Sequence, residues 1–209
     1  MAQVTSGIHS ILSVPAIYDL AQTLMGASRN RNWMQREFIR ARAGERVLDV
    51  GCGTADILSV MPDVDYVGFD ISEPYIAKAK ARWGSRGKFH AEFLDSVRIE
   101  RYGKFDLILA TGLLHHLDDE EVDSLFKTLA KGLKKGGRII TVDGTYVPGQ
   151  NPVARFVISQ DRGRSVRSPE AYTALAKAHF ESVEGRVESR AWIPYTYWIM
   201  RISHEPLVA

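Results

Sequence analysis

The sequence has little cysteine: Cys52 is the single thiol among 209 residues. One cysteine excludes an intrachain disulfide framework and a zinc site built from several cysteines. Because Cys52 lies between two glycines, Gly51 and Gly53, we expect its thiol to pack rather than to act as a nucleophile.

Long hydrophobic runs and a large net charge are also missing. No apolar stretch reaches the roughly 20 residues that cross a bilayer, so we expect no membrane association. We expect no secretory signal and a cytoplasmic location, because no charged segment is followed by an apolar core near residue 1. The net charge of +2 gives no argument for a nucleic-acid partner. The expected partner is a small molecule, and the expected assembly is a monomer or a homodimer.

A chain of this length with 45% hydrophobic residues suits one globular domain. After residue 44, strand-like and helix-like patterns alternate, which predicts an α/β fold with a parallel sheet and right-handed crossovers. The expected strands cover residues 46–51, 65–70, 88–94, 105–111, 138–142, 183–189 and 196–202. The expected helices start near Thr54, Ser72, Asp118 or Asp119, and Ser168, with a short one near 154–159.

The segment Glu45–Asp56 joins a buried strand to a glycine turn and the predicted start of a helix. Gly51 and Gly53 have no Cβ, so the backbone can approach a ligand closely there. Thr54 is expected to cap a helix that runs to residue 61. The free N–H groups and the positive end of that helix would then face the turn and form a cradle for a small polar ligand.

Acidic residues follow the next two expected strands. Asp70 ends the second strand, where a carboxylate can accept two hydrogen bonds from a ribose diol. The alternative role for Asp70 is a helix cap before Ser72. Asp95, followed by Ser96, comes after the third strand, where an acid can accept from an exocyclic amine. Together with the glycine turn, these residues predict a nucleoside site across three strand ends.

Four motifs occur in a fixed order along the chain. They are Val47–Thr54 (Val-Leu-Asp-Val-Gly-Cys-Gly-Thr), Val67–Ser72 (Val-Gly-Phe-Asp-Ile-Ser), Phe105–Leu117 (Phe-Asp-Leu-Ile-Leu-Ala-Thr-Gly-Leu-Leu-His-His-Leu) and Leu133–Ile140 (Leu-Lys-Lys-Gly-Gly-Arg-Ile-Ile). In this order they resemble the motifs of class I S-adenosylmethionine (SAM)-dependent methyltransferases of the small-molecule type, similar to the quinone-biosynthesis methyltransferases. The resemblance covers residues 44–145 well and the flanks in outline.

The resemblance implies a Rossmann-like α/β fold with a seven-stranded sheet in the order 3-2-1-4-5-7-6. Only strand seven would be antiparallel, and helices would cover both faces. It also implies SAM as the cofactor and S-adenosylhomocysteine as the product. By position, the cofactor-binding residues would be Asp49, Gly51 and Gly53 near the methionine part, Asp70 at the ribose, Ile71 near adenine, Asp95 and Ser96 at the adenine edge, and Thr111 at the methionine end.

The chain departs from the family pattern at Ala55, where a third glycine is usual, and at Lys135, where proline is frequent. We expect the alanine to need only slightly more room. We expect a single domain. Its parts would be a helical cap (1–43, two helices joined near 26–32, the second with an arginine-bearing polar side), the SAM-binding core (44–145), a substrate-cover insert (146–168) and a C-terminal helix with strands (169–209).

Methyl transfer from a sulfonium depends mainly on geometry and on excluding water. An acceptor hydroxyl also has to lose a proton, which a histidine near its ordinary pKa can assist. His115 and His116 follow the fourth strand, and we expect one of them to face the acceptor. The alternative is that His116 packs and His115 orients the turn. Weaker candidates for the acceptor pocket are Tyr18, Asp143, Tyr146, Tyr195 and Trp198.

The predicted function is methyl transfer from SAM to a small molecule, with O-methylation of an aromatic or polyketide-like acceptor first and C- or N-methylation left open. No group of acids near Asp143 resembles the metal site of catechol-type methyltransferases, so we expect no metal. One rival is a nicotinamide-dependent dehydrogenase, but Asp56 stands where its Gly-x-Gly-x-x-Gly pattern needs the last glycine. Another rival is a SAM-binding regulatory or scaffold protein without catalysis.

Overall fold

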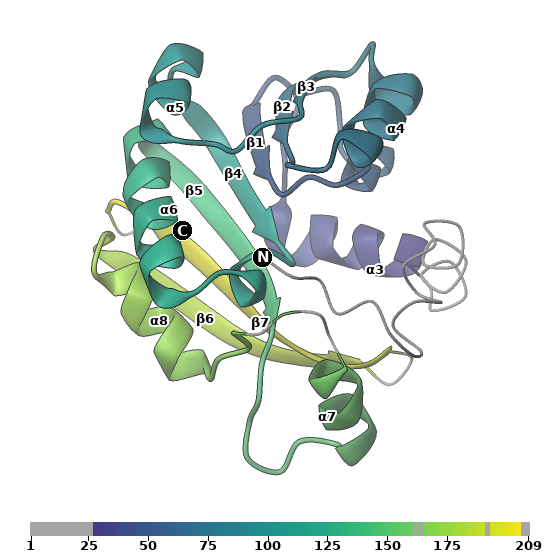
Figure 1. The fold of residues 1–209 in the computed structure, drawn as a ribbon, viewed down its shortest axis with the longest axis vertical. Helices are drawn as coiled ribbons and strands as arrows, with labels where there is room; N and C mark the ends of the chain where they lie inside the picture. Colours follow the sequence, from purple (N-terminus) through teal and green to yellow (C-terminus); the bar gives the residue numbers. More distant parts are fainter. Residues whose placement is uncertain (1–26, 161–162, 164, 191–192, 206–209) are drawn as a thin grey trace.

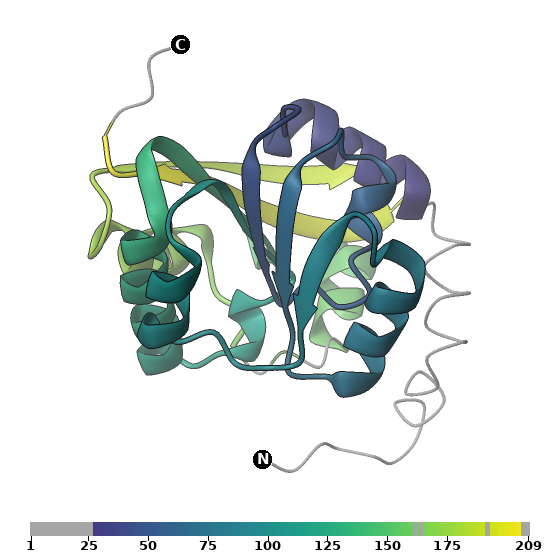
Figure 2. The same cartoon turned by 90° about the horizontal axis from the view of Figure 1, so that it is seen from above.

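The computed structural model describes residues 27–160, 163, 165–190 and 193–205. The first expected N-terminal helix and Tyr18 lie outside these residues. The described residues form one sheet with helices packed on both of its faces (Figures 1 and 2).

The sheet has seven strands in the order β3-β2-β1-β4-β5-β7-β6. The strands from β1 to β5 pair in parallel, whereas β7 is antiparallel to both of its neighbours, β5 and β6. This arrangement confirms the expected fold class and strand order. The strands are β1 (Arg46–Val50), β2 (Asp65–Phe69), β3 (Gly87–His90), β4 (Phe105–Thr111), β5 (Leu133–Gly144), β6 (Ser182–Arg190) and β7 (Ile193–Ser203).

Two hydrophobic layers hold the helices to the sheet. One layer joins the sheet to α5, α6 and α8, and the other joins it to α3, η1, η2 and α4. The helix α7 packs against β7. The helical elements are α3 (Ala27–Met34), the π-helical turn η1 (Gln35–Ile39), the 3-10 turns η2 (Asp56–Ser59) and η3 (Leu114–His116), α4 (Glu73–Trp83), α5 (Ser96–Tyr102), α6 (Asp119–Gly132), α7 (Pro152–Ser159) and α8 (Pro169–Lys177).

Three helices begin where local capping chemistry predicts. The Ser72 hydroxyl caps α4, and the Ser168 hydroxyl caps α8, each followed by an early proline. Asp118 caps α6 through a capping box with Glu121. In each case the capping side chain accepts a hydrogen bond from an N–H group of the first turn. Because this contact is local, the sequence predicts these three helix starts correctly.

The expected helix from Thr54 to residue 61 is wrong. The segment contains only the four-residue turn η2, and its N-cap Ala55 has the left-handed backbone of φ 54° and ψ 33°. A left-handed residue cannot continue a right-handed helix, and Pro62 disfavours helical backbone at the residue before it. Ala55, which replaces the usual third glycine, therefore adds backbone strain as well as a side chain, because L-residues rarely adopt this conformation.

Other boundaries also differ from the expectation. The helix α5 was not expected, although Asp95 accepts a hydrogen bond from the Arg98 N–H and caps it. The third strand is shorter than expected and ends at His90. The fifth strand starts at Leu133 rather than at Arg138, because Leu133 already pairs with Phe105 of β4, and a register shift separates this pair from the Leu107–Arg138 pair. The arginine-bearing N-terminal segment ends its helical run at Ile39.

Candidate functional site

The glycine turn after β1 is held against the end of β2 by its own N–H groups. The Phe69 carbonyl accepts from the Gly51 N–H (2.8 Å) and the Cys52 N–H (3.0 Å). The Asp70 carboxylate accepts from the Gly53 N–H (2.8 Å) and, with its other oxygen, from the Ser72 N–H (2.8 Å). The expectation that the free N–H groups and the dipole of a helix from Thr54 form the cradle is wrong, because that helix is absent and the N–H groups of residues 51–53 already donate within the fold. The turn instead presents a carboxylate at its rim.

Asp49 lies directly before this turn and is 2% exposed. Its Oδ2 accepts a hydrogen bond of 2.6 Å from the Tyr66 hydroxyl, and its Oδ1 is buried without a hydrogen-bond partner. Burial raises the pKa of Asp49 to about 7, and the nearby Asp70 charge adds to this, while the Tyr66 hydrogen bond acts against it. An unpartnered buried acceptor is costly, so it indicates a donor that arrives with a ligand.

The turn has open space beside Gly53, and exposed apolar side chains follow the ends of β2 and β3. A Cβ added at Gly53 would meet nothing within 4 Å, whereas one at Gly51 would lie 3.2 Å from the Leu113 side chain. Ile71, directly after Asp70, is 74% exposed, and Phe93, in the segment after β3, is 62% exposed. Large apolar side chains in such positions can pack on the faces of a planar ligand.

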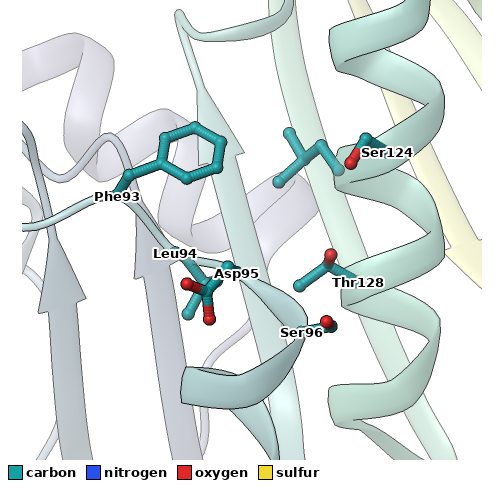
Figure 3. A pocket seen from close by; sticks show the side chains of 7 residues that line it. Phe93, Leu94, Asp95, Ser96, Ser124 and Thr128 are labelled. Atoms are coloured by element: carbon teal, nitrogen blue, oxygen red, sulfur yellow. The ribbon is translucent and has the colours of Figure 1, made fainter.

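Asp95 and Ser96 line a small pocket between the segment that leads into α5 and the facing side of α6 (Figure 3). Figure 3 shows the Phe93 ring on the same segment and Ser124 and Thr128 on α6. The pocket measures about 120 Å³, too small for a whole nucleoside cofactor, because ligand pockets usually exceed ~300 Å³. Asp95 also caps α5 and forms an ion pair with Arg98, so part of its acceptor capacity is already used.

A larger hollow of about 320 Å³ is lined by Glu100, Gly103, Lys104 and Lys131. It lies next to the amino end of β4, since Gly103 and Lys104 immediately precede Phe105. Ligands in open α/β sheets bind outside the carboxyl ends of the strands. We therefore assign this hollow no part in the site.

A second polar group lies at the carboxyl ends of β4 and β5. His115 is 4% exposed and Asp143 is 2% exposed. The Asp143 Oδ1 atom lies 2.8 Å from the His115 Nδ1 atom and also accepts from the His115 backbone N–H at 3.2 Å. Because a carboxylate only accepts, the imidazole proton lies on Nδ1. The second carboxylate oxygen, Oδ2 of Asp143, is buried without a hydrogen-bond partner.

Three described residues beyond α7, Gly163, Ser165 and Arg167, contact the His115 side of this pair or the η3 turn that carries it. A Cβ at Gly163 would clash with the His115 ring and carbonyl, so only glycine fits there. The Ser165 N–H donates to the His115 carbonyl (3.0 Å). Arg167 donates to the carbonyls of Leu114 (2.9 Å) and Leu117 (2.8 Å). Arg167 thus holds the η3 turn.

The remaining predicted residues are more open. His116 is exposed, and its ring centroid lies 4.1 Å from that of His115. Thr111, at the end of β4, is exposed as well. Tyr146 is partly buried. The Arg155 guanidinium carbon lies over the Tyr146 ring, 5.0 Å from the ring centroid.

Sequence reasoning missed Tyr66, Gly163 and Arg167. For Tyr66 a signal exists in the pattern Tyr-Val-Gly at residues 66–68, where a glycine inside a strand indicates close approach of another group. For Gly163 and Arg167 the partners lie far away along the chain, and no local pattern indicates them.

A protein-family model described as "Methyltransferase domain" matches residues 48–139. These residues contain the glycine turn, Asp70, Asp95 and both histidines. The chain belongs to the class I SAM-dependent methyltransferases. The family's cofactor is SAM, which fits the unpartnered Asp49 oxygen, the open face of Gly53 and the Asp70 carboxylate.

Two curated methyltransferases show the extent of the similarity. Phosphoethanolamine N-methyltransferase 3 of Arabidopsis thaliana is 30% identical over 154 residues, which cover 70% of this chain and 31% of that protein. The 27-O-demethylrifamycin SV methyltransferase of Amycolatopsis mediterranei is 32% identical over 116 residues, which cover 51% of this chain and 41% of that protein. The chain therefore spans less than half the length of these relatives.

Among solved structures, the pyocyanin biosynthetic protein PhzM shares the fold, with a TM-score of 0.69 and 18% identity over 95% of this chain and 62% of that one. In the described part of the chain, no group of three or more His, Cys, Asp or Glu side chains is arranged to hold a metal ion. None of the helices described here has the length and hydrophobicity to cross a membrane.

Proposed function

We propose that this protein transfers the methyl group of SAM to a small-molecule acceptor. The observation that carries the proposal is the pair of carboxylates around the glycine turn. Asp49 offers a buried acceptor without a partner, and Asp70 is fixed at the rim by Gly53 and Ser72. An ammonium group and a ribose diol are the donors that these two carboxylates suit.

In this proposal the Oδ1 atom of Asp49 accepts from the ammonium of the methionine part. Asp70 uses one lone pair on each oxygen for the backbone and keeps one on each for the two ribose hydroxyls. Ile71 and Phe93 pack against adenine. Asp95 and Ser96 lie at its edge, and Thr111 borders the methionine end.

SAM supplies a methyl group already activated by the sulfonium, so the chain's own residues have to orient the two reactants and exclude water. We propose His116 as the residue that accepts a proton from the acceptor, because it is the exposed member of the histidine pair. His115 and Asp143 act behind it as a buried anchor that fixes the η3 turn. Tyr146 is kept as a candidate for the acceptor pocket.

O-methylation of an aromatic or polyketide-like acceptor remains the first proposal for the reaction. It is supported by the similarity to the 27-O-demethylrifamycin SV methyltransferase and by the exposed His116 in the turn after β4. The similarity to a phosphoethanolamine N-methyltransferase makes N-methylation the alternative to be tested. The experiment therefore has to include both hydroxyl and amine acceptors.

The test is incubation of the protein with methyl-labelled SAM and the small-molecule fraction of a cell extract, followed by mass analysis. The expected result is label in one or a few small molecules. Binding of SAM without transfer to any molecule would favour a regulatory or scaffold protein. Absence of SAM binding would contradict the proposal altogether.

A further inference from the structure

The Tyr66 side chain reaches Asp49 through space that two glycines without side chains leave open. In β3, Gly87 pairs with Tyr66, and a Cβ there would lie 2.9 Å from the Tyr66 ring. In β2, Gly68 lies two residues further along the same face, and its Cβ would lie 3.0 Å from the ring. Gly68 is also the register partner of Asp49 in β1. The ring therefore lies across Gly68 and places its hydroxyl on the Asp49 carboxylate.

The contact determines which carboxylate oxygen remains available. The Tyr66 hydroxyl donates to Oδ2 at 2.6 Å, and Oδ1 keeps no partner. Tyr66 is 1% exposed, and both burial and the Asp49 charge hold its pKa far above the ordinary value. The hydroxyl thus stays protonated and remains a donor.

We infer that Tyr66 is a positioning residue for the donor site, which fixes Asp49 so that Oδ1 receives the ammonium of SAM. This inference rests on the proposed function. The single hydrogen bond from Tyr66 both fixes the rotamer of Asp49 and stabilises its charged form. The residue is internal to the sheet and touches no ligand itself.

The groups that face Asp49 make its charge sensitive to this hydrogen bond. Burial and the Asp70 charge raise the pKa of Asp49 and the Tyr66 hydrogen bond lowers it, with a net value of about 7. The Cys52 thiol, which packs against Gly68, has its own pKa raised by burial and by both carboxylates and stays neutral. On the other side, β4 contributes the apolar Leu109.

The test compares wild type with Tyr66→Phe by calorimetry from pH 6 to pH 9. The two ligands are SAM and 5′-methylthioadenosine, which keeps the adenosine part but lacks the ammonium. We expect Tyr66→Phe to weaken SAM binding by about tenfold at pH 7.5 and to move the pH midpoint of binding up by about one unit. Binding of 5′-methylthioadenosine should stay within about twofold, since it does not use Asp49. Comparison with wild type cancels the titration of the ligand's own amine.

Tyr172→Phe is the matched control. It removes a hydroxyl from an equally buried tyrosine, which donates to the Gly144 carbonyl at 3.2 Å. We expect no change in SAM affinity or in its pH profile. Equal losses for both ligands, an unchanged pH midpoint, or the same effect from both tyrosine variants would overturn the inference. If wild type binds 5′-methylthioadenosine and SAM equally well, Asp49 has no role in recognition, and the inference also fails. Failure of wild type to bind SAM at any pH would instead refute the proposed function.

Discussion

The His115 imidazole and the Asp143 carboxylate form a buried pair in which one aspartate oxygen binds both the ring nitrogen (2.8 Å) and the backbone N–H (3.2 Å) of the same histidine. The pair ties the turn after β4 to the end of β5. It therefore fixes the position of His116, whose ring lies against that of His115.

The first prediction concerns His116. Changing His116 to Gln removes the proposed base, and we expect kcat to fall by about 10²–10⁴ with an unchanged dissociation constant for SAM. The measurement is single-turnover methyl transfer over a range of pH, in parallel with calorimetry. A larger loss of kcat from His115→Gln in a folded protein would assign the base to the buried histidine instead.

Gly163 offers a test of how the cover holds the pair. Changing Gly163 to Ala puts a methyl group against the His115 ring and its carbonyl. We expect a loss of about 1–3 kcal/mol in the free energy of unfolding, as for other overpacked contacts. Urea unfolding measures this change. An unchanged midpoint would show that the segment does not pack on His115 in solution.

The ionisation of Asp49 should lower the free energy of unfolding as the pH rises. Its pKa in the folded protein is about 7, above the ordinary value of 3.8, so the unfolded chain loses the proton first as pH rises. The contribution of Asp49 to the free energy of unfolding is fully present below about pH 4 and declines as the pH rises to about 7. We therefore expect Asp49→Asn to be more stable than wild type at pH 8 by on the order of 4 kcal/mol, and equal to it near pH 4.

Asp106 provides the control with the opposite sign. Partial burial acts to raise its pKa, but hydrogen bonds from the Lys134 ammonium and the Arg46 N–H hold the pKa below its ordinary value. Its contribution to stability is present above the unfolded pKa and is lost as pH falls. Asp106→Asn should thus destabilise the protein at pH 8, and thermal melts of both variants across pH measure the two signs. Parallel pH profiles for the two variants would contradict this account.

Phe93 tests the adenine part of the site. It is 62% exposed, and we expect Phe93→Ala to weaken SAM binding by about 1–3 kcal/mol through lost stacking. Phe156 on α7 is the control, because it is exposed to a similar extent, 64%, but lies outside the proposed donor site. Calorimetry with SAM should show no change for Phe156→Ala. Equal effects of the two substitutions would remove the support for stacking.

The sequence predicted those features that depend on local chemistry or on the strand pattern. The caps Ser72, Asp118 and Ser168 and the position of Asp70 beside the glycine turn belong to this group. The sheet order was instead implied by the resemblance to the methyltransferase family. The contact of Asp70 with Gly53 follows from adjacent parallel strands, whose carboxyl ends meet at one edge.

Other features depend on contacts between distant residues or on strain. The left-handed backbone of Ala55 replaces a helix by a short turn, and no helix propensity indicates it. The hydrogen bond from Tyr66 to Asp49 requires the register of two strands and two glycines to be known. The cover of His115 by Gly163 depends on how a long connection returns to the sheet. Tertiary geometry decides these points.

The central claim, that SAM binds at the carboxyl ends of β1 and β2, is tested most directly by calorimetric titration of SAM into wild type and Asp70→Ala. We predict that wild type binds SAM, that NADH produces no comparable heat, and that the substitution weakens SAM binding by about 1.5–3 kcal/mol through loss of hydrogen bonds to a charged group. An equal affinity of the two proteins for SAM, or tight binding of NADH without SAM binding, would contradict the account.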